Sequence, residues 1–222
     1  MMTRVLIALN AIGFLWEIVV AGPGMLSLNG GGNMDRVLQE GSLYPAAVLQ
    51  GHEWWRIVTG AFLHGGLLHI GVNMMSLWFL GRFIEYAMGS WRMLLVYVIS
   101  LVVSGLGVVF FSAPYVPTVG ASGAIFGLFG ALFAIGLKLG KPGMQLVRDN
   151  LGILVINLII TFTVPAISWQ AHVAGLLGGF AVTFLLYSPP RRVQPVVVDA
   201  NTGAALESEY QTPNSPPDQR RQ

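Results

Sequence analysis

The chain has 222 residues, of which 54% are hydrophobic and only 10% are charged. A soluble domain carries about 25% charged residues, so the composition excludes an ordinary soluble globular protein and indicates a polytopic membrane protein. The net charge of +2 is too small to suggest nucleic-acid binding, and the absence of cysteine excludes disulfides, thiolate chemistry and cysteine metal sites.

Six apolar segments approach the roughly 20 residues that a spanning helix needs. We therefore predict an all-α, six-helix transmembrane bundle with spans at 5–21, 66–83, 92–111, 120–137, 150–165 and 169–187. The first segment resembles a signal peptide in its single Arg and its small-residue end. We favour a retained first helix, because its roughly 17 apolar residues are long enough to span.

The long segment 22–65 separates the first two spans and contains Trp54 and Trp55 beside Arg56. Tryptophan favours the headgroup region of a membrane, and an arginine there can reach lipid phosphates. We interpret Trp55 and Arg56 as structural residues of an interfacial anchor in this loop, in preference to a direct catalytic role.

After Tyr187 the composition changes to Pro and polar residues without periodicity, which predicts disorder. The sequence thus predicts two parts. Residues 1–188 form a six-helix membrane domain that includes the 22–65 loop, and residues 189–222 form a disordered cytoplasmic tail.

Basic residues predict the orientation of the spans. In a six-span arrangement only Arg36 and Arg56 lie on one side, and the other side carries Arg4, Arg82, Arg92, Lys138, Lys141, Arg148, Arg191, Arg192, Arg220 and Arg221. The positive-inside rule then places both termini in the cytoplasm and the 22–65 loop outside. Spans two, four and six therefore run from outside to inside.

Four polar residues fall at the starts of these three spans. His69 and Asn73 begin the second span, Ser122 begins the fourth and His172 begins the sixth. With a rise of about 1.5 Å per residue, all four lie within several ångströms of one depth. Because polar groups in spans are costly and usually functional, we predict a site just below the outer surface.

Small residues favour contact between the fourth and sixth spans. Both segments are rich in glycine: Gly120, Gly123, Gly127, Gly175 and Gly179. Glycine lets helix backbones approach closely in membranes, although a G-x-x-x-G spacing alone also fits a simple packing motif. Close approach would bring Ser122 within the 2.6–3.2 Å or so of His172 that a nucleophile and its base require.

The chemistry that these residues allow is acyl transfer. A serine hydroxyl is a poor nucleophile until a base takes its proton, so we predict Ser122 as nucleophile and His172 as general base. A carboxylate often orients such a base. Glu85 lies at the cytoplasmic end of span two, at the wrong depth, whereas Glu17 near the outer end of span one stays open. Phe126, one turn after Ser122, could instead hold the His172 ring by stacking.

Acyl transfer also needs hydrogen-bond donors where the oxyanion forms. His69 and Asn73 supply side-chain donors, and Ser122 supplies a backbone N–H from the start of a helix, where amides have no internal partner. Gly120 and Gly123 let the substrate backbone come close.

Each residue also has a non-catalytic explanation. A lone Ser in a span usually bonds to its own helix backbone, and Asn73 alone would join helices. We interpret His64 and His52 as interfacial residues, although His64 could also line the path of water. Three His with an Asn could suggest a metal site, but Asn is a poor zinc ligand, so we predict no metal and no cofactor.

In this order the motifs resemble those of the rhomboid intramembrane proteases. The resemblance covers roughly residues 5–187 and rests on Trp55-Arg56, His69…Asn73, Glu85…Gly89, Gly120-Ala121-Ser122-Gly123 and Ala171-His172…Gly175…Gly179. G-x-S-G alone is a weak motif, but the ordered set on spans two, four and six is specific.

The resemblance implies a Ser122–His172 dyad with His69 and Asn73 in the oxyanion hole. It implies partners that are transmembrane protein substrates in the lipid bilayer, with no nucleic acid and no metal. Cleavage would occur in or near their transmembrane segments. The site would open to the extracytoplasmic side of the cell membrane, and substrates would pass helices two and five. Some members have Tyr where this chain has Phe126, which preserves stacking but loses a hydroxyl.

Two alternatives remain. A rhomboid-like pseudoprotease would bind membrane clients without cutting them, and the retention of Ser122, His172, His69 and Asn73 argues against it. A transporter with a midplane site would need polar residues deeper in several spans, which the long uncharged interior of 93–111 does not provide.

Overall fold

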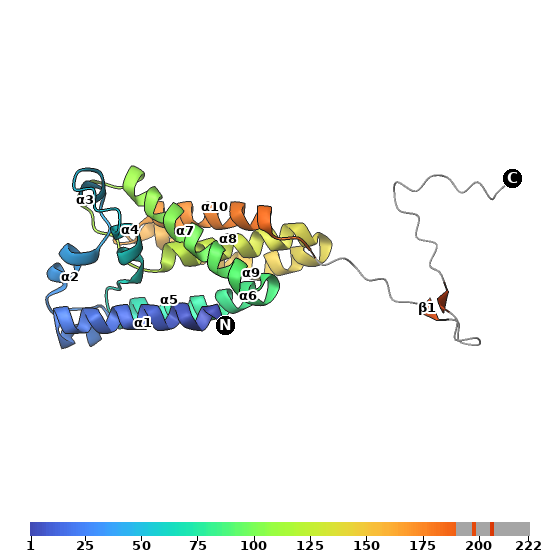
Figure 1. The fold of residues 1–222 in the computed structure, drawn as a ribbon, viewed down its shortest axis with the longest axis horizontal. Helices are drawn as coiled ribbons and strands as arrows, with labels where there is room; N and C mark the ends of the chain where they lie inside the picture. The colour runs from blue at the N-terminus through green and yellow to red at the C-terminus, as the bar shows by residue number, and fades with distance from the viewer. Residues whose placement is uncertain (190–196, 199–204, 207–222) are drawn as a thin grey trace. The chain divides into compact units, whose positions relative to one another are not determined.

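The computed structural model describes residues 1–189, 197–198 and 205–206 (Figure 1). Residues Met1–Pro189 form one compact unit with six helices long and apolar enough to cross a membrane. Its α-helices are α1 (Met2–Ala21), α2 (Met34–Gly41), α3 (Pro45–Leu49), α4 (Arg56–Thr59), α5 (Leu67–Ser76), α6 (Arg82–Met88), α7 (Ser90–Phe111), α8 (Ser122–Leu139), α9 (Lys141–Thr163) and α10 (Trp169–Leu186). The prediction of an all-α, six-span polytopic fold is confirmed.

The second span is longer than predicted. It runs through α5, the π-helical segment η3 (Leu77–Gly81) and α6, and ends at Met88 rather than at residue 83. The carboxylate of Glu85 explains the difference, because it accepts hydrogen bonds from the Met2 N–H (2.5 Å), the Thr3 N–H (3.1 Å) and the Ser90 hydroxyl (2.5 Å). Because these donors satisfy its carboxylate, Glu85 lies inside the helix and does not mark the end of the span.

The fifth span also begins earlier than predicted, at Lys141 rather than at residue 150. Gly140, with a φ of 68°, ends α8 and permits an immediate change of direction, and Pro142 lies in the first turn of α9. The first turns of α9 are polar, and there Gln145 donates a hydrogen bond to Asp149 at 2.7 Å. A search for apolar runs misses such a start because polar turns can extend beyond the hydrocarbon.

Loop and terminal segments gather at opposite ends of the bundle. At one end the start of α1 meets Glu85, and Met88, Arg92 and Tyr187 line one small cavity. At the other end lie α2, α3, α4 and the 3-10 turns η1 (Pro23–Leu26) and η2 (Gly60–Phe62). The side of the membrane that each end faces remains a prediction from the basic residues.

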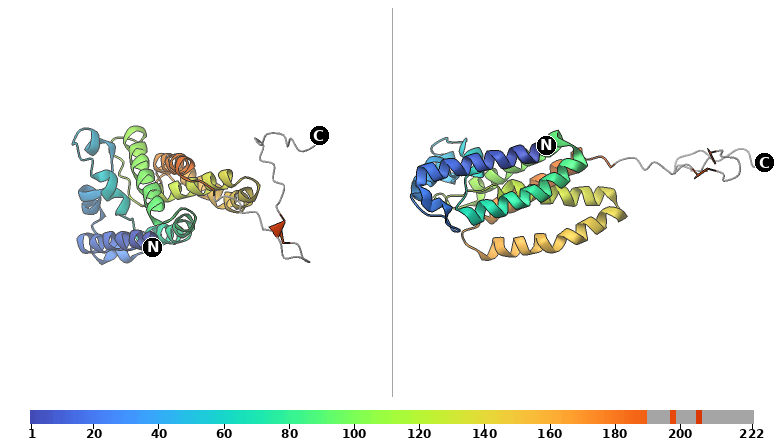
Figure 2. Two further views of the ribbon diagram at one scale, coloured as in Figure 1. Left: turned by 45° about the vertical axis from the view of Figure 1, so that its right-hand side comes forward. Right: turned by 90° about the horizontal axis from the view of Figure 1, so that it is seen from below.

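Helix α8 lies at the centre and α9 at the edge of the bundle (Figure 2). In the most apolar 18-residue stretch of each helix, 72% of α8 is buried but only 11% of α9. The backbones of α8 and α10 meet at glycine, because a Cβ added at Gly175 or Gly179 would collide with the carbonyl groups of Gly123 and Gly127. Glycine is therefore required for this close approach.

Residues 190–222 form a separate unit, of which only two short strands are described. Strands β1 (Val197–Val198) and β2 (Ala205–Leu206) pair antiparallel, with Val197 opposite Leu206. The rest of the predicted disordered tail at 189–222 lies outside the described residues, apart from Pro189 itself.

Candidate active site

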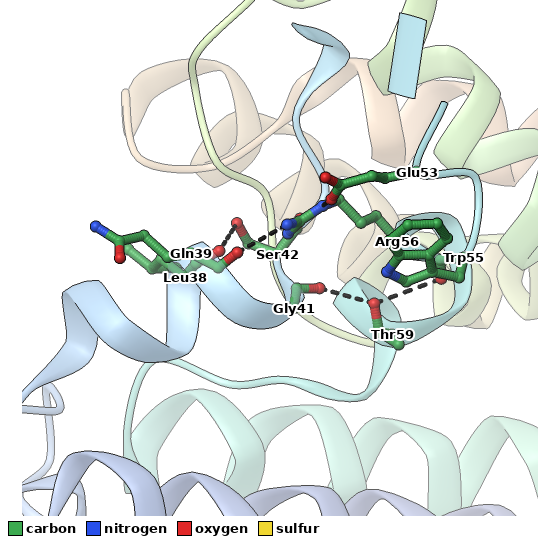
Figure 3. A network of polar contacts seen from close by, with 8 residues as sticks. All are labelled: Leu38, Gln39, Gly41, Ser42, Glu53, Trp55, Arg56 and Thr59. Atoms are coloured by element: carbon green, nitrogen blue, oxygen red, sulfur yellow. Dashed lines mark hydrogen bonds and ion pairs between the residues drawn. The ribbon is translucent and has the colours of Figure 1, made fainter. Parts of the chain in front are cut away.

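The loop before α5 is held together by Arg56, which is 6% exposed (Figure 3). Its guanidinium donates hydrogen bonds to the carbonyls of Ser42 (2.8 Å) and Gln39 (2.7 Å) and pairs with the Glu53 carboxylate. The expectation that Arg56 reaches lipid phosphates is therefore wrong, since its donors are used inside the loop. Trp55 is 56% exposed, so the interfacial anchor stays a prediction for Trp55, whereas Arg56 is buried in the loop.

Ser122 and His172 face each other across the α8–α10 contact. The Ser122 Oγ and His172 Nε2 atoms are 2.8 Å apart, which is hydrogen-bond distance. Ser122 is the first residue of α8, and Ser168 caps α10 by accepting a hydrogen bond from the Ala171 N–H at 3.2 Å. The glycine contacts between the two helices bring these starts together.

Two further residues hold the His172 ring. The Phe126 ring stacks on it with centroids 4.1 Å apart and planes at 14°. On another side, the Thr161 hydroxyl of α9 lies 2.8 Å from His172 Nδ1. Sequence reasoning missed Thr161 because it looked for a carboxylate. The available signal was its position near the C-terminal end of span five, level with the start of span six.

The His69 ring lies beside the serine on the α5 side. Its Nδ1 accepts a hydrogen bond from the Gly65 N–H at 3.1 Å, so the proton of a neutral ring resides on Nε2. A Cβ built on Gly120, whose φ is +120°, would come within 2.8 Å of that Nε2 and 3.6 Å of Ser122 Oγ. The missing side chain at Gly120 therefore leaves space next to both His69 Nε2 and the serine oxygen.

Asn73 lies one turn further along α5. Its Nδ2 donates one hydrogen bond to the His69 carbonyl at 2.8 Å, which leaves the second amide hydrogen available. The Ser122 N–H is in the first turn of α8, where backbone amides lack intrahelical acceptors. Three potential donors of different origin thus belong to residues that line one cavity.

Glu17 and His64 are located differently from the expectation. Glu17 accepts a hydrogen bond from the His64 N–H at 2.7 Å, so this carboxylate holds the loop before α5 rather than orienting His172. His64 is fully buried, 5.1 Å edge-on from the His69 ring, and the interfacial interpretation is wrong. Burial, and next the neighbouring His69, lower the pKa of His64 to about 3. His52, in contrast, is exposed.

One cavity of about 1070 Å³ is lined by the serine, the imidazoles of His69 and His172, and their neighbours. It is lined on the α5 side by residues that include His69 and Asn73, and on the α9 side by residues that include Thr161. Ser122 and His172 lie in the same lining. Within the part of the chain that the structure describes, no three His, Asp or Glu side chains gather as metal ligands.

Comparison with known proteins gives the family of the chain. The Rhomboid domain model matches residues 51–189. Rhomboid protease GluP of Bacillus subtilis (strain 168) is 37% identical over 167 residues, which are 74% of this chain and 32% of GluP. The putative rhomboid protease YdcA of the same strain is 35% identical over 141 residues, 63% of this chain and 71% of YdcA.

A relative whose name describes it as inactive also matches. Inactive RHOMBOID-like protein 8 of Arabidopsis thaliana is 31% identical over 159 residues, 70% of this chain and 45% of that protein. The chain thus spans less than half of GluP and of this plant protein. The domain match covers more than half of the chain, and together with YdcA it shows that this multi-pass membrane protein belongs to the rhomboid family.

Proposed function

We propose that the chain is an intramembrane serine endopeptidase that cleaves transmembrane segments of membrane proteins near the outer membrane face. The observation that carries this proposal is the 2.8 Å contact between Ser122 Oγ and His172 Nε2 in a shared cavity. Family membership supports intramembrane proteolysis in general, and the dyad and the outer-face position are the finer parts of the proposal.

In the first half-reaction, Ser122 Oγ attacks the scissile carbonyl carbon while its proton passes to His172 Nε2. The tetrahedral intermediate then collapses, the C–N bond breaks and His172 gives the proton to the leaving amine. Water, activated by His172 in turn, attacks the acyl-enzyme ester and releases a carboxylic acid and free Ser122. Such general acid–base help is typically worth about 10²–10⁴-fold in rate.

Charge on the intermediate's oxygen requires donors that already point toward it. The Nε2–H of His69, the free amide hydrogen of Asn73 and the Ser122 N–H are the proposed donors. The loss of one such donor costs about 2.7–4 kcal/mol of transition-state stabilisation in a well-studied serine protease.

The substrate must expose a peptide carbonyl that a helix normally shields. We therefore expect cleavage at segments with small or helix-destabilising residues, because these unwind at low cost. The apolar side chains that line much of the cavity, such as Leu68, Val72 and Ile160, suit an apolar segment, and the polar side chains near Ser122 suit the water molecule that hydrolysis consumes.

The test is cleavage of a model single-span substrate in liposomes by the wild type, Ser122→Ala and His172→Ala. We expect the wild type to cut and Ser122→Ala to be inactive, and His172→Ala should lose about 10²–10⁴-fold in kcat. Protection of the cut site from a membrane-impermeant reagent on one side would locate it relative to the membrane. Equal cleavage by the wild type and Ser122→Ala would refute the dyad.

The alternative is a rhomboid-like protein that binds membrane clients without cutting them. The match to an inactive relative supports this alternative. A serine-directed fluorophosphonate discriminates between the two. Labelling of the wild type that is lost in Ser122→Ala supports the protease, whereas an unlabelled wild type that still captures a single-span client supports the inactive form.

A further inference from the structure

We infer that Thr161 is a positioning residue that fixes the proton of His172 on Nδ1 and thereby keeps Nε2 free to accept the proton of Ser122. This inference rests on the proposed function, because only a general base needs that tautomer. The residue acts through His172 and does not itself contact the reacting atoms.

The two neighbours of the Thr161 hydroxyl fix the direction of its hydrogen bond. The Thr161 hydroxyl lies 2.7 Å from the Asn157 carbonyl oxygen and 2.8 Å from His172 Nδ1. A carbonyl oxygen only accepts, and a hydroxyl has one hydrogen, so that hydrogen goes to Asn157. The Thr161 oxygen then accepts from His172, which requires a hydrogen on Nδ1.

The position of this hydrogen determines the tautomer of the His172 ring. A neutral imidazole has one hydrogen, and with Nδ1 protonated its Nε2 has a free lone pair. This Nε2 lies 2.8 Å from Ser122 Oγ, so the serine donates to it. The opposite tautomer would direct an N–H at the serine and could not take its proton.

Burial of both side chains favours the hydrogen bond between Thr161 and His172 over bonds to other acceptors. Thr161 is 3% exposed and His172 is 7% exposed, so competition from bulk water is limited. Neither Glu17 nor Glu85 takes the role of a carboxylate partner, because Glu17 binds the His64 N–H and Glu85 binds the start of α1. Phe126 stacks on the ring face and supplies no acceptor to Nδ1.

His69 offers an internal contrast. Its Nδ1 accepts from the Gly65 N–H, so its Nε2 carries the hydrogen. The imidazoles of His69 and His172, which line the same cavity as the serine, therefore have opposite tautomers, each set by the partner of Nδ1. One is suited to donate to an oxyanion and the other to accept a proton.

The test compares Thr161→Val, which removes the hydroxyl at nearly constant shape, with Thr161→Ser, which keeps it. Thr163→Val is the matched control, because Thr163 is exposed on the same helix and makes the same bond one turn back, to Ile159 at 2.7 Å. Cleavage of the single-span substrate in liposomes gives kcat and KM. In parallel, ¹⁵N-histidine NMR gives the tautomer of His172, assigned by its absence in His172→Ala.

We expect Thr161→Val to lower kcat by about 5- to 10-fold with little change in KM, the effect of one neutral hydrogen bond. Its His172 signals should lose the Nδ1–H pattern, and Thr161→Ser and Thr163→Val should resemble the wild type. Unchanged kcat and tautomer in Thr161→Val would overturn the inference, as would a loss of kcat with the wild-type tautomer retained. A wild type that neither cleaves nor labels would refute the protease, and the NMR result would still decide the tautomer.

Discussion

Helices α8 and α9 are both long and apolar enough to span a membrane, yet they have different surroundings. In their most apolar stretches, 72% of α8 is buried by other helices and only 11% of α9. The proposed nucleophile, Ser122, stands on the buried helix, whereas Thr161, which orients its base, stands on the exposed one. Helices of similar apolar composition can thus serve as a fixed scaffold or as a peripheral element that contacts the site at few points.

The same contrast predicts which helix is held less firmly and where mutations destabilise the protein. The cavity is bounded by α9 on one side, and α9 contacts the rest of the bundle far less extensively than α8 does. Because Thr161 joins α9 to His172, a displacement of α9 would separate the hydroxyl from the ring. We therefore expect mutations to affect stability strongly on α8 and weakly on α9.

The largest expected effect comes from truncating a buried leucine. Leu128 on α8 is 0% exposed, and Leu151 on α9 is 46% exposed. Leu128→Ala should lower the free energy of unfolding by about 2–5 kcal/mol, because it leaves a cavity among packed helices. Leu151→Ala should change it by less than about 1 kcal/mol. Reversible denaturation in mixed micelles measures both values, and equal losses would contradict the packing difference.

A smaller effect is expected from adding one methyl group. In Gly179→Ala the new Cβ meets the Gly127 carbonyl group, which is backbone and cannot rotate away. This should cost about 1–3 kcal/mol of stability. Gly152 on α9 is the control, since a Cβ there meets nothing within 4 Å and Gly152→Ala should be neutral or slightly stabilising. Thermal unfolding in detergent compares the two variants, and a tolerant Gly179 would show that α8 and α10 can separate without cost.

Acid should lower the stability of the folded protein through the buried histidine His64. His64 is fully buried, with a pKa of about 3 in the folded protein against 6.5 for an ordinary histidine. Between these values the unfolded chain binds more protons than the folded one, so stability falls as pH drops below about 6.5. The contribution of His64 is at most about 1.4 kcal/mol per pH unit.

Unfolding measured at several pH values between 7 and 4 checks this third effect. His64→Gln should flatten the pH dependence, because it removes the buried imidazole. If His64→Gln retained the wild-type slope, another group would be responsible for acid sensitivity.

Amino-acid order alone predicted much of the fold, because hydrocarbon selects for long apolar runs and basic residues mark the segments between them. The six spans are confirmed, with ends that differ where polar residues extend a helix, as at Lys141 and Glu85. The motif order likewise indicated the family, since Ser122, His172, His69 and Asn73 each lie within the first two turns of a span. Their catalytic roles stay predictions.

Tertiary structure decided which groups serve as partners, because a hydrogen bond depends on distances between segments that sequence spacing does not give. Arg56 binds loop carbonyls instead of lipid, and Glu17 binds the His64 N–H. Thr161, an ordinary residue of an apolar helix by sequence, lies 2.8 Å from His172 Nδ1. Periodicity and depth place a residue along its own helix, whereas its neighbours depend on how the helices pack.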